Sequence, residues 1–441
     1  MAEKIIQFGT GNFLRGFADY FIDVLNEKNL YDGKIVIVQP TKGGKSGLIN
    51  EQKGQYNLYL RGVENSEEIC EHRLIKSVSR SIDPYADFEG YLSLSGNKEI
   101  RFIISNTTEA GIAFDENDKF EDRPALSFPG KLTQLLYHRF SLSLPGFIIL
   151  PCELIDNNAD ALKECVMKYA ALWNLGESFI KWLEEENTFC NTLVDRIVTG
   201  YPVNEAEALF KEIGYEDKLL NTAEIFHLWV IEGDFEKELP LKKAGFNVIW
   251  TEDVKPYKKM KVRILNGSHT SLVFPSLLCG VESVGESLRD EQLRSFLSLC
   301  LKKYILPVLG ETDENKAFAK ATLERFSNPY IRHLWKSISL NSVSKFTARV
   351  LPTALDYIEE KNDPPKPLIF ALACLIEYYK TEDVTDDEYA VSFIKEKSID
   401  EILGNEKLWG VNLSSMVLLV RESMDKLHSL GIREALTWAM N

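Results

Sequence analysis

The chain has 441 residues, of which 45% are hydrophobic and 27% are charged, and its formal net charge at pH 7 is −15. This composition is that of a folded globular protein, and the length exceeds what one hydrophobic core usually serves, so at least two domains are expected. The acidic balance argues against nucleic acid as a partner, and the absence of any run of 18 apolar residues argues against a membrane-spanning helix.

The first predicted element is the apolar strand Lys4–Phe8, which leads into a glycine turn and a helical pattern over Asn12–Glu27. Turns of this kind hold the pyrophosphate of a dinucleotide at the start of the helix. The match is a variant, because Leu14 stands where the fingerprint has its third glycine and Gly16 follows two residues later. An ordinary strand-to-helix turn is the alternative, in which Arg15 faces solvent instead of a phosphate. The candidate cofactor-binding residues of the turn are Phe8, Gly9, Gly11, Asn12, Phe13 and Arg15.

Four more β-branched runs follow, and helical patterns separate several of them, as over Leu132–Phe140 and residues 157–188. Strands that are buried on both faces and alternate with helices predict an α/β fold with a doubly wound, mostly parallel sheet of the Rossmann type. We expect this domain to cover residues 1–253. The four runs are Lys34–Val38, Arg101–Ser105, Gly146–Leu150 and Phe246–Thr251.

The loops after two of these strands add candidate cofactor contacts, because ligands bind at the carboxyl ends of parallel strands. The second strand runs into Gln39 and Thr41 without the acidic residue that usually holds the adenosine ribose. Gln39 and Thr41 are therefore the candidate ribose ligands. The choice between NAD and NADP stays open, since Lys42 would tolerate a 2′-phosphate. The third strand runs into Asn106 and Thr107, which either face the same crevice or cap a helix.

After about residue 255 the strand patterns end and amphipathic helical patterns take over. We therefore expect an all-α C-terminal domain over residues 254–441. The patterns cover Tyr257–Leu278, Asp290–Leu306, Glu314–Phe326, Val343–Glu360, Leu368–Tyr379, Asp386–Lys397 and Ser414–Leu430.

The first of these helical patterns contains the candidate catalytic residues Lys261, Asn266 and His269, close to the expected domain boundary. A lysine whose pKa is lowered by apolar surroundings and neighbouring cations is a usable general acid or base, and Asn and His can hydrogen-bond a developing alkoxide. A packed or capping histidine is the alternative. Asn266 and His269 lie about 60° apart around an α-helix, whereas Lys261 lies about 140° from Asn266. The spacing predicts a shared face for Asn266 and His269 and leaves the place of Lys261 open.

At these residues the chain resembles the polyol-specific long-chain dehydrogenase/reductase family, which includes the mannitol dehydrogenases. The three candidate catalytic residues match the family's K-x4-N-x2-H motif, and the segment from Gly9 to Arg15 matches its G-x-G-x-F-x-R turn. The resemblance extends to Val194–Ile197 and Asn328–His333. It implies an NAD-dependent oxidoreductase that acts on a CH–OH group without a metal, with the lysine as general acid/base and the Asn and His polarising the carbonyl.

Within the family, three segments resemble members that reversibly reduce D-tagaturonate, a keto-uronate, to D-altronate in hexuronate catabolism. The three segments are Val38–Thr41, Asn106–Ile112 and Pro151–Ile155. A uronate carries a carboxylate and needs an additional cation. The candidates are Lys345, which aligns with a substrate-binding lysine of the family, and Arg349, unless these are surface charges. Mannitol dehydrogenases have a second oxyanion-contacting Asn, and Cys152-Glu-Leu replaces that segment here, so Asn157 is a further substrate-binding candidate.

The nearest alternatives are sister enzymes of the same family, fructuronate reductase or mannitol-1-phosphate 5-dehydrogenase. A non-catalytic NAD- or sugar-binding regulator is the alternative of another class. Retention of all three of Lys261, Asn266 and His269 argues against it, since binding alone does not need the lysine. The six histidines show no paired ligand spacing, so no metal site is expected. The expected partners are NAD and a small uronate or aldonate, with neither nucleic acid nor membrane, and no oligomeric state is predicted.

The seven cysteines are scattered and include no CxxC pair. Together with a strand that begins near Lys4, which leaves no room for a secretory signal, they predict reduced thiols and a cytoplasmic location.

Overall fold

The computed structural model describes residues 1–441, and these form two compact units. The first comprises Met1–Arg61 and Ile69–Lys255, and the second comprises Gly62–Glu68 and Pro256–Asn441. The chain therefore passes into the helical unit after Lys255, close to the expected boundary after residue 253. None of the helices combines the length and the apolar character that a bilayer crossing needs.

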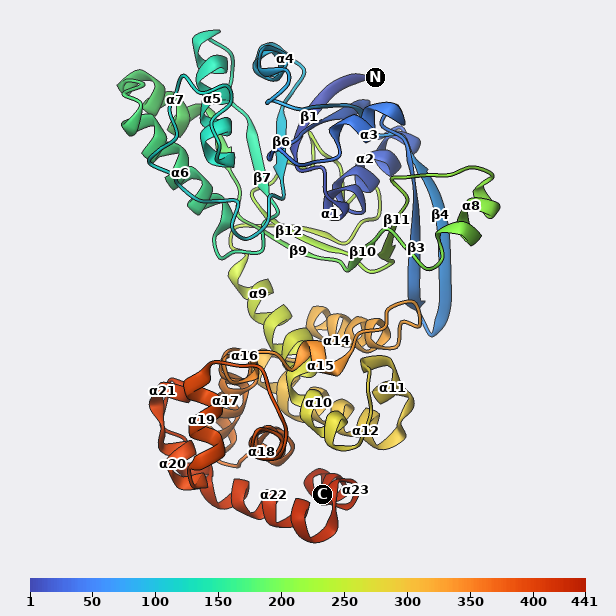
Figure 1. Cartoon of the computed structure of the whole chain (residues 1–441), viewed down its shortest axis with the longest axis vertical. Helices are drawn as coiled ribbons and strands as arrows, with labels where there is room; N and C mark the ends of the chain where they lie inside the picture. Colours follow the sequence, from blue (N-terminus) through green and yellow to red (C-terminus); the bar gives the residue numbers. More distant parts are fainter. The chain divides into compact units, whose positions relative to one another are not determined.

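The centre of the first unit is a sheet of six parallel strands in the order β5-β2-β1-β6-β7-β8. Its strands β1, β6 and β7 are labelled in Figure 1. The order reverses at β1, as in a doubly wound fold. Phe8 pairs with Val38 on one side and Ser105 on the other, so the ends of β1, β2 and β6 meet at one edge. The strands are β1 (Ala2–Phe8), β2 (Gly33–Val38), β5 (Val78–Ile82), β6 (Phe102–Ser105), β7 (Ile148–Pro151) and β8 (Thr188–Phe189). The expected Rossmann-like parallel sheet is confirmed.

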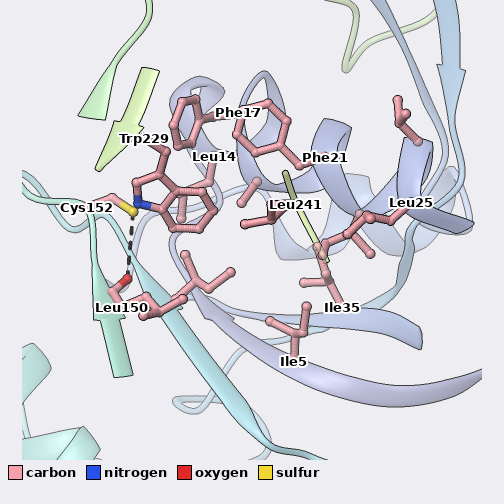
Figure 2. Packing of buried hydrophobic residues seen from close by; sticks show 14 of the residues in the cluster. Ile5, Leu14, Phe17, Phe21, Leu25, Ile35, Leu150, Cys152, Trp229 and Leu241 are labelled. Atoms are coloured by element: carbon pink, nitrogen blue, oxygen red, sulfur yellow. Dashed lines mark hydrogen bonds between the residues drawn. The ribbon is translucent and has the colours of Figure 1, made fainter. Parts of the chain in front are cut away.

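Both faces of this sheet are buried, which explains why its strands read as continuous apolar runs. On one face, Ile5 and Ile35 belong to a core that also contains Phe21 of helix α2 and Trp229, as Figure 2 shows. On the other face, Ile6 belongs to a second core with side chains of α5, α6 and α7. Successive side chains of β1 therefore pack against helices on opposite faces of the sheet.

The helices of the first unit differ from the sequence prediction at two positions. The helical pattern over residues 157–188 is divided in the structure between α6 (Asn158–Leu172) and α7 (Glu177–Glu186), and Asn174 and Gly176 between them have positive φ. The pattern over Asn12–Glu27 predicted one helix, and the structure has two, because the chain leaves helical geometry at Phe17 (φ −130°, ψ −89°). The helices are α1 (Asn12–Arg15), α2 (Ala18–Glu27), α3 (Ser46–Glu51), α4 (Phe88–Ser93), α5 (Phe128–Ser141), α6 (Asn158–Leu172), α7 (Glu177–Glu186) and α8 (Ala206–Ile213), with a 3₁₀ turn at Leu94–Gly96.

Two smaller sheets were not predicted from the sequence. They have the orders β10-β11-β3-β4 and β13-β12-β9, and the pairs β10–β11 and β9–β12 are antiparallel. The run expected at Phe246–Thr251 forms β13 of the second of these sheets, so its assignment to the main sheet was wrong. The strands are β3 (Tyr56–Glu64), β4 (Glu67–Ile75), β9 (Thr192–Asp195), β10 (Val198–Gly200), β11 (Asn221–Glu224), β12 (Leu228–Glu232) and β13 (Val248–Thr251).

The second unit is helical, as expected, and is built around α18, whose residues Pro367–Ile376 are all buried. This helix packs against α10 and α22. The pattern over Val343–Glu360 predicted one helix, but α16 ends at Arg349 and α17 begins at Leu351. Pro352 accounts for the break, since proline lacks an N–H and its ring clashes with a preceding turn.

The helices of the second unit include two π-helical turns, at Val262–Asn266 (η2) and Cys300–Ile305 (η3), and a 3₁₀ turn at Ser414–Met416. The α-helices are α9 (Lys255–Lys261), α10 (Gly267–Leu278), α11 (Val284–Arg289), α12 (Glu291–Leu299), α13 (Leu306–Leu309), α14 (Asp313–Phe326), α15 (Trp335–Ile338), α16 (Ser342–Arg349), α17 (Leu351–Lys361), α18 (Lys366–Thr381), α19 (Glu388–Glu396), α20 (Ile399–Gly404), α21 (Glu406–Trp409), α22 (Val417–Leu430) and α23 (Ile432–Met440).

Candidate active site

The glycine turn of the first unit lies at the carboxyl edge of the main sheet, between the ends of β2 and β6. The Gly9 N–H donates to the carbonyl oxygen of Val38 at 3.1 Å, and a Cβ at Gly9 would lie 2.8 Å from the carbonyl oxygen of Asn106. Gly9 also has a φ of +133°, so both space and conformation demand glycine there. Gly11 is exposed, and a Cβ there would meet nothing within 4 Å. The turn is thus tightly packed at Gly9 and open to solvent at Gly11, which fits the approach of a dinucleotide phosphate.

Arg15 occupies neither of the two positions considered from the sequence. It is fully buried, and its guanidinium donates to the carbonyl oxygen of Leu219 and to Oδ1 of Asn12. A buried guanidinium bonded in this way does not offer its own hydrogens to a phosphate. Arg15 therefore acts on the turn indirectly, by holding Asn12 in place.

The two phenylalanines of the turn are packing residues. Phe8 is fully buried and its ring lies 5.0 Å from that of Phe128, while Phe13 stacks on Phe17 with ring centroids 5.0 Å apart. Only the backbone of Phe8 belongs to the edge of the sheet, where its carbonyl oxygen accepts from the Asn106 N–H.

The loop after β6 is held by a buried carboxylate that the sequence analysis did not single out. Glu153 accepts from Ser105 Oγ through Oε2 at 3.0 Å, and from the N–H and hydroxyl of Thr107 through Oε1 at 2.9 and 3.0 Å. Burial raises the pKa of Glu153, although these hydrogen bonds oppose the shift. The Asn106 amide donates to the carbonyl oxygen of Cys152 at 2.7 Å. Asn106 and Thr107 thus lie just after the end of β6, and both of their side chains are already hydrogen-bonded.

A pocket of about 680 Å³ opens beside the ends of β2 and β5, where a Rossmann fold receives the adenosine half of its cofactor. Gln39 lines it but is buried, and its Oε1 accepts from the Ser46 N–H. Thr41 is exposed and its hydroxyl donates to the carbonyl oxygen of Gly43. Asp83, at the end of β5, brings a carboxylate to the pocket. No acidic residue follows the second strand, β2, but Asp83 follows the neighbouring strand β5. The sequence analysis considered only the residues after the second strand and did not identify Asp83.

In the second unit, the candidate catalytic segment is not a regular helix. Lys261 ends α9, Val262–Asn266 form the π turn η2, and α10 begins at Gly267, whose N–H reaches back to the carbonyl oxygen of Val262. A π turn contains one residue more than an α turn, so residues five apart lie one turn apart. Lys261 and Asn266 are five apart. The extra residue therefore reduces the angular offset that an α-helix would impose, so we expect Lys261 and Asn266 on the same side of the helix.

Two contacts fix this segment against its neighbours. A Cβ at Gly267 would lie 3.1 Å from the carbonyl oxygen of Arg349, so the small residue admits the end of α16 beside the π turn. Arg263 is buried and donates to Thr353 Oγ1 at 2.8 Å and to Asp356 at 3.1 Å. Arg263 is therefore a structural residue that ties the π turn to α17.

His269 lies in an aromatic setting. Its ring stacks on Phe326 with centroids 4.0 Å apart and an interplanar angle of 13°, and it meets His333 edge-on at 5.2 Å. Burial holds the pKa of His269 well below its usual range, and the nearby His333, Arg325 and Arg349 lower it further. The imidazole is consequently neutral at neutral pH. A neutral imidazole can donate one hydrogen bond through a ring N–H.

Around His269 the structure gathers four basic residues, which we call the cationic cluster: Arg325, His333, Lys345 and Arg349. Lys345 donates to the carbonyl oxygen of Ile338 at 2.8 Å. Arg349 is half-buried, and its guanidinium has neither a hydrogen-bond nor an ion-pair partner. Burial lowers the pKa of Arg349. Of the two cations expected from the sequence, Arg349 is thus the one left free to meet an anion.

Asn157, the remaining substrate-binding candidate, lies in the first unit. It has a left-handed conformation (φ +50°) at the start of α6, and its side chain is exposed. The neighbouring Asn158 is the structural residue, since its amide donates to the carbonyl oxygens of Pro151 and Glu153. The role of Asn157 stays a prediction.

The sequence analysis did not identify Arg325 or His333 as site residues. Both are brought near His269 by contacts between segments that are distant in the sequence. Arg325 and His333 join the cluster from α14 and the loop that follows it. The pairing of His333 with His269 spans 64 residues of sequence, by subtraction of their numbers. The segment Asn328–His333 was singled out only by resemblance, and no periodicity in the sequence connects it with the Lys–Asn–His motif.

Family models match both parts of the chain. The model described as "Mannitol dehydrogenase Rossmann domain" matches residues 3–243, and the one described as "Mannitol dehydrogenase C-terminal domain" matches residues 253–431. Among curated relatives, an altronate oxidoreductase of Bacillus subtilis (strain 168) is 42% identical, over 98% of this chain and 94% of the relative. An altronate oxidoreductase of Escherichia coli O139:H28 is 43% identical, over 98% and 96%.

Solved structures with the same fold include D-sorbitol dehydrogenase in substrate-free form, with a TM-score of 0.87 and 23% identity over 99% of this chain and 95% of that one. They also include the ternary complex of Pseudomonas fluorescens mannitol 2-dehydrogenase with NAD and D-mannitol, with a TM-score of 0.70 and 21% identity over 99% and 94%. At these identities the similarity establishes the fold.

Proposed function

The chain belongs to the mannitol dehydrogenase family, and from this we propose that it is an NAD-dependent oxidoreductase that interconverts D-tagaturonate and D-altronate. Relatives at 42% and 43% identity over nearly the whole chain carry the name altronate oxidoreductase, which supports this substrate pair. The observation that carries the proposal is the cationic cluster beside His269, with Arg349 unpaired. A neutral polyol would leave the guanidinium of Arg349 without a counter-ion, whereas the carboxylate of a uronate matches it.

The glycine turn and the pocket beside Asp83 are the proposed cofactor site. The Gly9–Gly11 backbone would receive the diphosphate, and Asp83 would accept a hydrogen bond from the adenosine ribose. When bound, NADH supplies the hydride for the carbonyl carbon. Both are proposed roles of residues whose positions fit the group.

Lys261 is the proposed proton donor to the carbonyl oxygen of the substrate in the direction of reduction, and the base in the direction of oxidation. Asn266 would donate its amide hydrogen to the same oxygen as negative charge develops there, and neutral His269 would donate one ring N–H. The π turn supports these roles, because a turn with one additional residue reduces the angle around the helix axis between Lys261 and Asn266. Arg349 would hold the carboxylate at the other end of the substrate. No step of this scheme uses a metal.

The test of the function is a substrate panel with the purified chain. NADH oxidation is measured with D-tagaturonate, D-fructuronate, D-fructose and D-fructose 6-phosphate, before and after treatment with EDTA. We expect kcat/KM for D-tagaturonate to exceed that for the neutral ketose by about 10³-fold or more, since a site built for a charged group rejects an analogue that lacks it. EDTA should change nothing. Turnover restricted to D-fructuronate or to the phosphate ester would replace the proposed substrate with that one.

Arg349→Met tests the proposed recognition of the carboxylate. Methionine keeps most of the apolar stem and leaves the backbone contact with Gly267 intact, so the change removes chiefly the charge. We expect kcat/KM for D-tagaturonate to fall about 30- to 100-fold, the value of a charge-assisted hydrogen bond, while activity on D-fructose stays within about threefold. Arg332→Met is the matched control, because Arg332 is exposed and pairs with Glu282 at the surface. An equal loss on both substrates would argue against carboxylate binding by Arg349.

A further inference from the structure

Lys45 brings a cation to the glycine turn of the first unit. It immediately precedes α3 in the loop that follows β2, and its backbone N–H donates to Thr10 Oγ1 at 3.3 Å. Its ammonium donates to Oδ1 of Asn12 at 3.2 Å. Thr10 and Asn12 are both residues of the turn. Lys45 is therefore held against the turn at its backbone and at the end of its side chain.

The charge of Lys45 has no acidic partner. The only hydrogen-bond acceptor of its ammonium is the neutral amide oxygen of Asn12, and the guanidinium of Arg15 donates to that same oxygen. Two cations thus converge on one neutral atom, in a chain whose net charge is −15. Lys45 is half-buried, and burial together with the charge of Arg15 lowers its pKa. The carboxylate nearest in sequence to Arg15 is that of Asp19, and burial raises the pKa of Asp19 to about 7.

A partly desolvated cation without a counter-ion is unfavourable unless an anion arrives in the functional state. The open side of the turn at Gly11 is next to Asn12, so an anion that approaches the exposed backbone there meets the ammonium as well. Backbone N–H groups and a lysine on one side of a turn are the elements from which proteins build diphosphate sites.

We propose that Lys45 binds the diphosphate of the dinucleotide and is its main charged contact in the first unit. This inference rests on the cofactor use proposed above and assigns a residue that no sequence motif indicated. Arg15, the basic residue of the G-x-G-x-F-x-R turn, then has the complementary role: it fixes Asn12, and Asn12 in turn positions the ammonium of Lys45. An alternative is that Lys45 only ties the loop after β2 to the turn.

The experiment measures binding, not turnover, for the wild type, Lys45→Met and Lys45→Arg. The probes are NADH, ADP and adenosine, with NADH followed by its fluorescence and the others by calorimetry. We expect Lys45→Met to weaken NADH and ADP about 10- to 100-fold and to leave adenosine within about twofold, since adenosine lacks the diphosphate. Lys45→Arg should recover most of the loss. The NADH affinity of the wild type should also fall more steeply with added salt than that of Lys45→Met.

Lys53→Met is the matched control, because Lys53 is exposed just beyond the other end of α3, and it should bind all three probes as the wild type does. An unchanged NADH affinity of Lys45→Met would overturn the proposal. So would an equal weakening of ADP and adenosine together with a lower melting temperature, which is the signature of a purely structural lysine. If the wild type binds neither NADH nor ADP, the cofactor proposal itself fails, and the role of Lys45 fails with it.

Discussion

Replacement of Lys261 by alanine is expected to lower kcat for NADH-dependent reduction of D-tagaturonate by about 10³-fold or more. General acid–base catalysis by a positioned side chain contributes about 10²- to 10⁴-fold, and Lys261 is the only proposed proton donor of the site. The cofactor residues lie in the glycine turn and the neighbouring loops, so the affinity for NADH should change by less than about threefold. Steady-state kinetics and a fluorescence titration with NADH measure the two quantities on the same preparation.

Two further variants separate proton transfer from the presence of a charge. Lys261→Arg retains the positive charge but replaces the proposed proton donor with a guanidinium, which does not release a proton, so it should be as inactive as Lys261→Ala. Lys259→Ala is the matched control, because Lys259 is exposed in the same helix two residues earlier. A Lys261→Arg enzyme with near wild-type kcat would show that the residue acts only as a charge, and an active Lys261→Ala enzyme would remove the mechanism altogether.

Substitution of Asn266 has the second largest expected effect. Loss of one donor to a developing oxyanion costs about 10²- to 10³-fold in kcat, which is the expectation for Asn266→Ala. Asn266→Asp is nearly isosteric, but it replaces the donor with a carboxylate that repels the oxyanion. Its kcat should therefore lie below that of Asn266→Ala, although its shape is closer to that of the wild type. Single-turnover measurements with saturating NADH report this step without interference from product release.

Asn412→Asp serves as the control for this charge change. Asn412 is exposed in the same unit and only accepts a hydrogen bond from the Ser414 N–H, a function that an aspartate keeps. We expect wild-type kinetics for Asn412→Asp. If Asn266→Asp were more active than Asn266→Ala, Asn266 would serve the site by its shape and not as a hydrogen-bond donor.

The main sheet could be predicted because its strands are buried on both faces. Residues on both faces of β1 and β2 are mostly apolar, as Ile6 and Val36 are, so polar residues do not alternate with them. The strands therefore appear in the sequence as continuous apolar runs. The two smaller sheets escaped prediction because their strands pair partly antiparallel and mix polar with apolar residues. Asn221–Glu224, for example, is fully buried yet reads as a polar loop, since its partner β3 lies far away in sequence.

Helix boundaries in the second unit were also incompletely predicted from the sequence. Amphipathic periodicity located the helices, but it did not detect the break between Arg349 and Leu351 or the π turns. One extra residue in a turn changes the apolar pattern too little to be seen. It nevertheless decides whether Lys261 lies on the side of Asn266 or far round the helix from it.

By itself the sequence determined the two-part α/β and all-α organisation and the candidate residues Lys261, Asn266 and His269, because these depend on local pattern and on motif spacing. The tertiary structure decided which hydrogen-bond or ion-pair partner each charged side chain has. It buried Arg15, which looked like a phosphate ligand, left Arg349 unpaired beside His269, and brought Lys45 to the glycine turn. The free energy of a charge depends on its surroundings, and residues distant in the chain supply those surroundings.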